Sequence, residues 1–256
     1  MNDAIYDGAH VVISSIIGRE FNNPLGASSF PILARLTGAQ CGGEPAVLDA
    51  GCGRGRTAVW WAGTGAGTVD GFDPSEPMLA EARQRAESAG LGTRIRFFNA
   101  TFSTFRPDVS YDLVIAHDVL AYCTDRGADT SRLASFLKPR GVMSVTDYWA
   151  GPDAAGLAGV IDKWGITTPA RFGDHVDFFA GIGLRILFHF DTTRQYRAHW
   201  ARILDVVGRM RPQLETAAGT PAVDAYRARV LAILAAIDGG GYGHCWSILE
   251  APHDHD

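Results

Sequence analysis

The sequence predicts an α/β protein with a doubly wound, mostly parallel sheet of seven strands and extra helical cover at two places. Three observations predict this fold. Apolar runs alternate with amphipathic helical stretches from about residue 45 onward. Several of these runs are almost continuously apolar, as strands buried on both faces are. A glycine-rich turn follows the first run, where an open parallel sheet places a ligand.

Seven stretches carry the strand pattern, and helical stretches separate most of them. The expected strands are residues 46–50, 68–73, 94–99, 111–117, 141–148, 184–190 and 244–251. In the helical stretch that follows the second strand, Ser75 is expected to cap the helix and Gly90 to end it.

Two regions depart from the simple alternation of strand and helix. Residues 1–40 precede the first strand and are expected to form an N-terminal helical cap, and residues 193–242 a helical insertion in the main domain, 41–256. Ligands of open parallel sheets bind beyond the carboxyl ends of the strands. Both helical regions are therefore candidates to cover that edge, and the alternative that they only enlarge the core stays open.

Composition narrows the class of protein. A hydrophobic content of 46% and a charged content of 20% are typical of a folded globular chain. The net charge of −5 disfavours a nucleic-acid binder, which needs a basic face. No apolar run is long enough to cross a bilayer, and the first residues lack the pattern of a secretory leader. The four cysteines fall in no metal-like pair, so we expect reduced thiols, no metal site and a cytoplasmic location.

The turn after the first strand indicates the ligand. Gly51, Gly53 and Gly55 follow the spacing G-x-G-x-G, whereas a dinucleotide site is typified by G-x-G-x-x-G. Asp49 stands two residues before the first glycine, and a carboxylate there repels a phosphate but suits an ammonium or sulfonium group. Asp73 ends the second expected strand, where an acid can hold ribose hydroxyls. The pattern favours S-adenosylmethionine, an adenosine without phosphates that carries a cationic sulfur.

Residues 46–148 resemble the class I S-adenosylmethionine-dependent methyltransferases, which have a Rossmann-like fold, in five motifs that occur in order. The motifs are VLDAGCGRG, VDGFDPSEPMLAEARQRA, RIRFFNATF, YDLVIAHDVLAY and FLKPRGVMSVTDYW. The resemblance implies that the glycine turn holds the methionine part, with Asp73 on the ribose. It implies that the adenine is bound by Met78, Asn99, Ala100 and Thr101.

Three further features of the resemblance bear on the site. Asn99 stands where many relatives have an acid, and Arg140 where a glycine is usual. Tyr6 is similar to a tyrosine that closes over the cofactor in many relatives. The stretch AHDVLAY and the late helices are similar to the subgroup that methylates sarcosine and dimethylglycine.

That subgroup often has a glutamine, an acid and a histidine at the positions of His117, Asp118 and Tyr122. Because two of these three positions differ, the resemblance implies a small-molecule acceptor without identifying it.

Methyl transfer from a sulfonium needs an aligned nucleophile, exclusion of water and removal of one proton. His117 and Asp118, after the fourth strand, are the candidate bases. The alternatives are that His117 only hydrogen-bonds the cofactor or its neighbours, and that Asp118 caps a helix or meets the cofactor's ammonium group.

Other candidate residues lie toward the acceptor. Tyr148 and Trp149 follow the fifth strand and could attract a cation or simply pack. Tyr122, Arg171 and His175 complete the predicted acceptor pocket, although an isolated arginine more often forms a surface ion pair.

The predicted activity is transfer of a methyl group to nitrogen, oxygen or carbon of a small molecule, by a monomer or homodimer. One alternative uses the same cofactor differently: its own amine attacks the γ-carbon and releases methylthioadenosine. A non-catalytic binder is a third possibility, which the intact glycine turn and Asp73 disfavour. A polymeric substrate suits the acidic, helix-covered chain less well.

Overall fold

The protein folds around one seven-stranded sheet in the order β3-β2-β1-β4-β5-β7-β6. The computed structural model describes residues 8–17, 29–41, 43–157, 168 and 171–251 of the 256. The strands are β1 (Ala46–Ala50), β2 (Thr68–Asp73), β3 (Ile95–Asn99), β4 (Tyr111–His117), β5 (Leu137–Ala150), β6 (Arg185–Asp191) and β7 (Tyr242–Glu250). All seven predicted strands are confirmed, with β5 beginning earlier than expected.

The sheet is mostly parallel, as predicted. The pairs β1–β2, β2–β3, β1–β4 and β4–β5 are parallel, whereas β7 is antiparallel to both β5 and β6. The carboxyl ends of β1, β2, β4 and β5 therefore lie at one edge, where a ligand of such a sheet binds.

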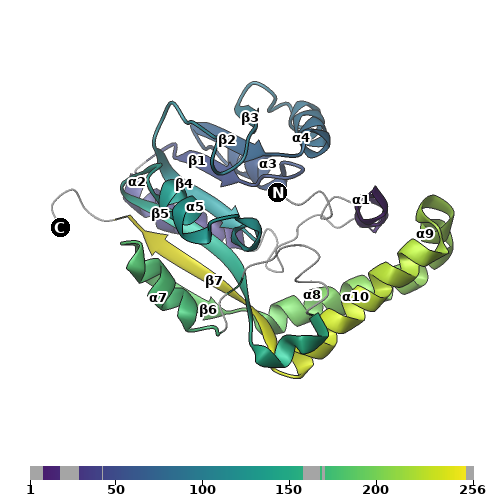
Figure 1. Cartoon of the computed structure of the whole chain (residues 1–256). Helices are drawn as coiled ribbons and strands as arrows, with labels where there is room; N and C mark the ends of the chain where they lie inside the picture. The colour runs from purple at the N-terminus through teal and green to yellow at the C-terminus, as the bar shows by residue number, and fades with distance from the viewer. Residues whose placement is uncertain (1–7, 18–28, 42, 158–167, 169–170, 252–256) are drawn as a thin grey trace.

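Helices cover both faces of the sheet (Figure 1). The shorter helices are α2 (Phe30–Cys41), α3 (Arg56–Gly63), α4 (Glu76–Ser88), α5 (Arg126–Ala134) and α7 (Asp174–Gly181). Ile115 and Val142 pack with Phe30 of α2 on one face of the sheet. Val114 and Val145 belong to a separate apolar cluster on the opposite face. Successive side chains of a strand point to opposite faces, so the near-continuous apolar runs serve both cores.

The ends of α4 only partly follow the prediction. Gly90 adopts a left-handed φ of +70° directly after Ala89, the C-cap of the helix, as a terminating glycine does. Ser75 occupies the N-cap position, but its side chain makes no capping hydrogen bond; instead its backbone N–H donates to Asp73.

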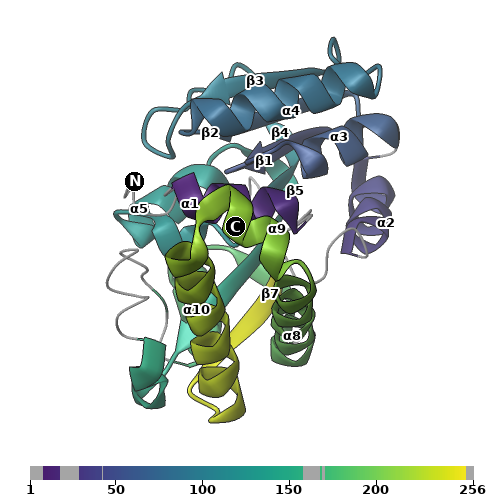
Figure 2. The ribbon, with the colours of Figure 1, turned by 90° about the vertical axis from the view of Figure 1, so that its right-hand side faces the viewer.

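The two N-terminal helices have different neighbours. Helix α2 packs against β4 and β5, and Phe30 and Leu33 join the core on that face. Helix α1 (Gly8–Ile16) instead contacts the late helices α9 (Arg211–Ala218) and α10 (Thr220–Asp238), as Figure 2 shows. Thus α2 enlarges the core. The grouping of residues 1–40 as one N-terminal helical cap stays a prediction.

The late insertion is helical, as predicted. Helix α8 (Thr193–Arg209) packs along α10, and the pair projects away from the sheet with α9 at its far end (Figure 1). Tyr196 and Trp200 of α8 share a buried cluster with Val230 of α10 and with Tyr148 and Tyr242 at the ends of β5 and β7. The insertion therefore builds a second core at the end of the sheet.

Arg140 stands where the resemblance led us to expect glycine, and its φ of +62° lies in the left-handed region. This region costs a residue with a Cβ about 1 kcal/mol or more. Replacing Arg140 with glycine is therefore expected to raise the free energy of unfolding by about 0.5–1 kcal/mol. Chemical denaturation measures this change, and a less stable variant would contradict the strain argument.

No helix among the described residues combines the length and the apolar character that crossing a membrane needs.

Candidate active site

The glycine turn after β1 depends on left-handed backbone. Gly51, Gly53 and Gly55 have φ values of +69°, +50° and +71°. A Cβ on Gly51 would lie 2.6 Å from a methyl carbon of Val119, and one on Gly55 would lie 2.7 Å from the Cβ of Ala82. No atom lies within 4 Å of a Cβ placed on Gly53. The turn is therefore packed at its two ends and open at its centre.

Asp73 fixes the turn from β2. One carboxylate oxygen accepts from the N–H of Gly53 at 3.0 Å, and the other accepts from the N–H of Ser75 at 2.9 Å. Burial raises the pKa of Asp73, although both hydrogen bonds oppose this shift. A carboxylate oxygen can accept more than one hydrogen bond, so Asp73 can still receive hydroxyl donors.

The predicted adenine-side residues lie beside Asp73. Asn99 pairs with Asp73 in the β2–β3 register, and its amide nitrogen donates to the carbonyl of Pro74 at 3.2 Å. In that orientation the amide oxygen of Asn99 is the group that could accept from an amino group. The N–H of Ala100 donates to the carbonyl of Asp73, and the backbone N–H and hydroxyl of Thr101 hydrogen-bond to Thr104. Met78 is half-buried in the first turn of α4.

Asp49 lies at the end of β1 with only 5% of its surface exposed. Its Oδ2 is buried and has no hydrogen-bond partner among the described residues. Burial raises the pKa of Asp49 to about 7; the hydrogen bond from Ala58 opposes this shift and the charge of Asp73 adds to it. Such a group is suited to a ligand that brings a positive charge, because the charge would restore the ionised form.

His117 ends β4 and is held by a serine of the next strand. Its Nε2 lies 2.8 Å from Oγ of Ser144, which also accepts from the indole N–H of Trp246 at 3.0 Å. Burial lowers the pKa of His117 to about 4; the charge of Asp118 opposes the shift, and His244 adds to it. A neutral His117 at pH 7 favours the alternative in which this residue hydrogen-bonds its neighbours or the cofactor.

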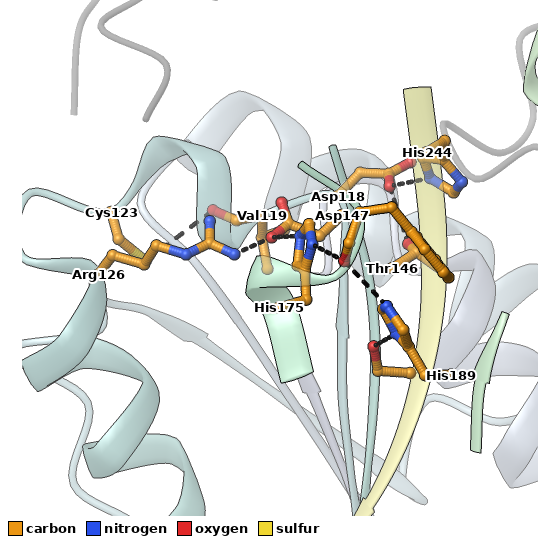
Figure 3. Close-up of polar contacts among 11 residues, drawn as sticks. Asp118, Val119, Cys123, Arg126, Thr146, Asp147, His175, His189 and His244 are labelled. Atoms are coloured by element: carbon orange, nitrogen blue, oxygen red, sulfur yellow. Dashed lines mark hydrogen bonds and ion pairs between the residues drawn. The ribbon is translucent and has the colours of Figure 1, made fainter. Parts of the chain in front are cut away.

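Asp118 follows His117 with a left-handed φ of 57°. Its Oδ1 accepts from the hydroxyl of Thr146 at 2.8 Å and lies 2.8 Å from Nε2 of His244 (Figure 3). Its Oδ2 is buried without a partner among the described residues. The side chain does not cap a helix; the cap of α5 is Asp125, which accepts from the N–H of Ala128.

Burial and the hydrogen-bond partners of Asp118 shift the pKa of its carboxyl group in opposite directions. Burial alone would raise its pKa, but the charge of His244 and the hydrogen bonds from His244 and Thr146 outweigh that and lower it. The Asp118 carboxylate is therefore ionised at neutral pH.

Tyr148 lies on the same face of β5 as Thr146, since the two are separated by one residue. Its ring is 5.5 Å from those of His244 and Tyr196 and 6.0 Å from that of Tyr242. Burial first, and then the charge of Asp118 and the neighbouring tyrosines, Tyr122 among them, raise its pKa well above the ordinary value. Tyr148 thus belongs to an aromatic group beside His244, the partner of Asp118.

Trp149 lies over Gly243 of β7. A Cβ on Gly243 would fall 2.2 Å from the Trp149 ring, so this glycine makes room for the indole. The indole nitrogen of Trp149 is buried and has no partner among the described residues.

His175 is in a different network. Its Nε2 lies 3.2 Å from Oδ2 of Asp147, which also accepts from Arg126, and its Nδ1 lies 3.2 Å from the carbonyl of Phe172. Figure 3 shows Arg126 and His175 converging on Asp147. Because Thr146 and Asp147 are adjacent in β5, they point to opposite faces. The structure therefore does not bring His175 together with Asp118.

Two predicted site residues remain, Arg171 and Tyr6, and the structure describes only the first. Arg171 is exposed, and its backbone N–H donates to Asp174 at 2.9 Å. Tyr6 lies outside the described residues. No group of side chains suited to a metal ion occurs among the described residues.

Sequence reasoning missed three residues that hold the site: Thr146, His244 and Thr192. Thr146 and His244 lie in predicted strands. The pairing of β5 with β4 brings Thr146 to Asp118 and the pairing of β7 with β5 brings His244 there, and neither pairing was visible in the sequence.

Comparison with known proteins shows what the chain is similar to. Residues 47–141 match the model of a family described as a methyltransferase domain. The methyltransferase GfsG of Streptomyces halstedii is 29% identical over 175 residues, which cover 66% of this chain and 63% of the relative. The ubiquinone biosynthesis O-methyltransferase of Rhodopseudomonas palustris (strain TIE-1) is 35% identical over 99 residues, 39% of this chain and 38% of the relative. The chain thus aligns with less than two thirds of the length of either relative.

A solved structure shares the fold over most of the chain. The provisionally named sarcosine dimethylglycine methyltransferase from Galdieria sulphuraria has a TM-score of 0.78 at 16% identity, covering 90% of this chain and 84% of that chain. Residues 47–141 thus match a methyltransferase-domain family, and the solved structure shows that this chain shares its fold.

Proposed function

We propose that this protein transfers the methyl group of S-adenosylmethionine to a small-molecule acceptor. One observation carries the proposal: a buried carboxylate, Asp49, stands just before the glycine turn, and its Oδ2 has no partner among the described residues. Buried carboxylate oxygens need donors or positive charge. A ligand with an ammonium and a sulfonium supplies both, whereas a pyrophosphate would be repelled.

The other predicted cofactor residues fit this ligand. The backbone of Gly51, Gly53 and Gly55 would approach its methionine part, and Asp73 would accept from the ribose hydroxyls. Met78, Asn99, Ala100 and Thr101 would border the adenine, and His117 would hydrogen-bond the cofactor's tail or stay with Ser144. Tyr6 is proposed to close over the cofactor.

The bound cofactor supplies an electrophilic methyl carbon on a cationic sulfur, which leaves as a neutral thioether with the electrons of the broken bond. The protein's task is to hold the acceptor in line and to receive the proton that the acceptor loses. Among the residues at the end of β4, the ionised Asp118 is better suited than the neutral His117 to accept a proton.

The acceptor side is proposed to include Tyr122 and Tyr148, with Trp149, Arg171 and His175 as more distant candidates. The names of the relatives favour small molecules, and the ubiquinone biosynthesis relative is named as an O-methyltransferase. We further propose a cytoplasmic monomer or homodimer that binds no nucleic acid. The free thiols of Cys52, Cys123 and Cys245 and the acidic composition support these points.

Cyclisation of the cofactor's own side chain is not favoured, because the relatives are named as methyltransferases. Product analysis separates the two reactions. Protein incubated with methyl-labelled cofactor and an extract of small metabolites should yield S-adenosylhomocysteine and a labelled small molecule. Methylthioadenosine formed without an acceptor would reject the proposal, as would tight cofactor binding with no labelled product from any extract.

Replacing Asp73 with asparagine is expected to weaken S-adenosylhomocysteine binding about tenfold, because one carboxylate oxygen that serves the turn or the ribose is lost. Calorimetry measures the affinity. Asp108 is the matched control. It is an exposed acid that pairs with Arg96, which also pairs with Asp70 of β2. Equal affinities for the Asp73→Asn and Asp108→Asn variants would contradict the assigned role.

A further inference from the structure

A buried row of hydrogen bonds joins the end of β4 to the beginning of the helical insertion. Nε2 of His244 lies 2.8 Å from Oδ1 of Asp118, and Nδ1 of His244 lies 2.6 Å from the hydroxyl of Thr192. Thr192 is the residue directly before α8. All three residues are buried, and His244 is fully so. The row therefore links three elements that are distant in the sequence.

The chemistry of the groups assigns the donors. An ionised carboxylate only accepts, so the hydroxyl of Thr146 and Nε2–H of His244 both donate to Asp118. Nδ1 of His244 pairs with the hydroxyl of Thr192, so the ring is held at both of its nitrogens.

The protein's own hydrogen bonds engage only one of the two carboxylate oxygens of Asp118. Oδ1 receives both bonds, and the backbone N–H of Asp118 donates to the carbonyl of Thr146 at 2.9 Å. Oδ2 is buried and receives no hydrogen bond from the described residues. A buried anionic oxygen in this state calls for a donor from elsewhere.

Aromatic packing fixes the histidine ring. The ring of Tyr196 stacks on His244 at 4.8 Å with 13° between the planes, and Tyr148 lies 5.5 Å away. Tyr148 belongs to the group that we place near the acceptor. The row thus ends beside the aromatic side chains that an acceptor would contact.

We propose that His244 and Thr192 are positioning residues that present Oδ2 of Asp118 to an N–H or O–H group of the acceptor. This inference rests on the proposed methyl transfer and narrows its acceptor to an amine or a hydroxyl compound. As the acceptor's lone pair bonds to the methyl carbon and the carbon–sulfur bond breaks, the acceptor's proton moves to Oδ2 and then to water. The helical insertion begins at this row, so it also supports the position of Asp118.

Paired substitutions test the row. Thr192→Val removes the hydroxyl at constant shape and Thr192→Ser retains it; His244→Leu removes the donor to Asp118, whereas His244→Gln can keep it. His189→Gln is the control, because His189 bonds to Ser247 and Phe172 outside the row. Turnover is measured with methyl-labelled cofactor against a panel of small phenols, alcohols and secondary amines, using the compound that the wild-type protein methylates fastest.

The expected pattern is a loss of kcat with little change in cofactor affinity. His244→Leu should lower kcat about thirtyfold and Thr192→Val about fivefold, since each removes one buried hydrogen bond of the row. The acidic limb of the pH profile should move to higher pH in His244→Leu, because the charge and the hydrogen bond of His244, which oppose the effect of burial on the pKa of Asp118, are then lost. Thr192→Ser, His244→Gln and His189→Gln should stay close to wild type.

Two outcomes overturn the inference and leave the proposed function standing. One is wild-type turnover and an unmoved pH profile in both Thr192→Val and His244→Leu. The other is a preferred acceptor that is methylated at carbon with no N–H or O–H group. If His244→Leu does not fold, wild-type turnover and an unmoved pH profile in Thr192→Val, with Thr192→Ser as its control, are sufficient to overturn the inference.

A spectroscopic measurement tests the row without any turnover. Wild-type protein that methylates no compound of the panel would count against the proposed function, not against the row. In protein labelled with ¹⁵N-histidine, the His244 signal, identified by its loss in His244→Gln, should show a proton on Nε2. Its Nδ1 shift should change in Thr192→Val and not in Thr192→Ser. An Nε2 without a proton, or no response to Thr192→Val, would overturn the row.

Discussion

Replacing Gly55 with alanine is expected to lower the free energy of unfolding by about 3 kcal/mol. The left-handed backbone costs a residue with a Cβ about 1–2 kcal/mol, and forcing extra atoms into packed surroundings costs about 1–3 kcal/mol more. The new Cβ would lie 2.7 Å from that of Ala82 and 2.9 Å from the ring of Phe97. Urea denaturation of the two proteins measures the difference.

Gly53→Ala is the matched control within the same turn. Gly53 is also left-handed, but no atom lies within 4 Å of its added Cβ, so only the backbone cost of about 1 kcal/mol remains. We expect Gly53→Ala to affect stability little and cofactor binding more, because the open centre of the turn is where a ligand approaches. Equal losses of stability in both variants would show that the turn is not packed as described.

Replacing Asp49 with asparagine is expected to weaken S-adenosylhomocysteine binding about 100-fold at pH 7.5, because a buried charge partner for the ammonium group is removed. In the wild-type protein the affinity should rise about tenfold between pH 5.5 and 7.5, since Asp49 ionises near pH 7 and only its ionised form attracts the ammonium. Calorimetry across this range should show no such rise in Asp49→Asn.

The same substitution is expected to stabilise the protein without ligand at high pH. The folded pKa of Asp49, about 7, lies above its ordinary value of 3.8. The folded state therefore keeps a proton that the unfolded state releases, and stability is lost as pH rises from about 4 to 7. Asparagine carries no charge, so at pH 8 the variant should be more stable by about 4 kcal/mol and near pH 4 equal. A variant that is less stable at pH 8 would contradict the assigned ionisation.

The fold could be predicted because its signals are local. Strand β4 reads as YDLVIAH and its interior is buried, which an apolar run between polar ends indicates directly. The turn glycines were recognisable by spacing, and all three adopt the backbone that only glycine enters freely. Gly90 likewise ends its helix by the conformation that its residue type predicts.

The candidate site could be predicted only in part. His117 and Asp118 are adjacent in the sequence, but their different states depend on Ser144, Thr146 and His244, which long-range strand pairing supplies. Periodicity predicts that a strand is buried, not which strands become its neighbours. The position of His175 could not be foreseen for the same reason, since its partner Asp147 points to the opposite face from Thr146.

Binding of the cofactor by the protein tests the central claim most directly. Calorimetry should give saturable binding of S-adenosylmethionine and S-adenosylhomocysteine at one site per chain, weakened by Asp49→Asn, and no heat from a nicotinamide dinucleotide. Uptake of the dinucleotide with no response to either adenosyl compound would contradict the claim that the buried carboxylate of Asp49 at the glycine turn receives a positively charged ligand.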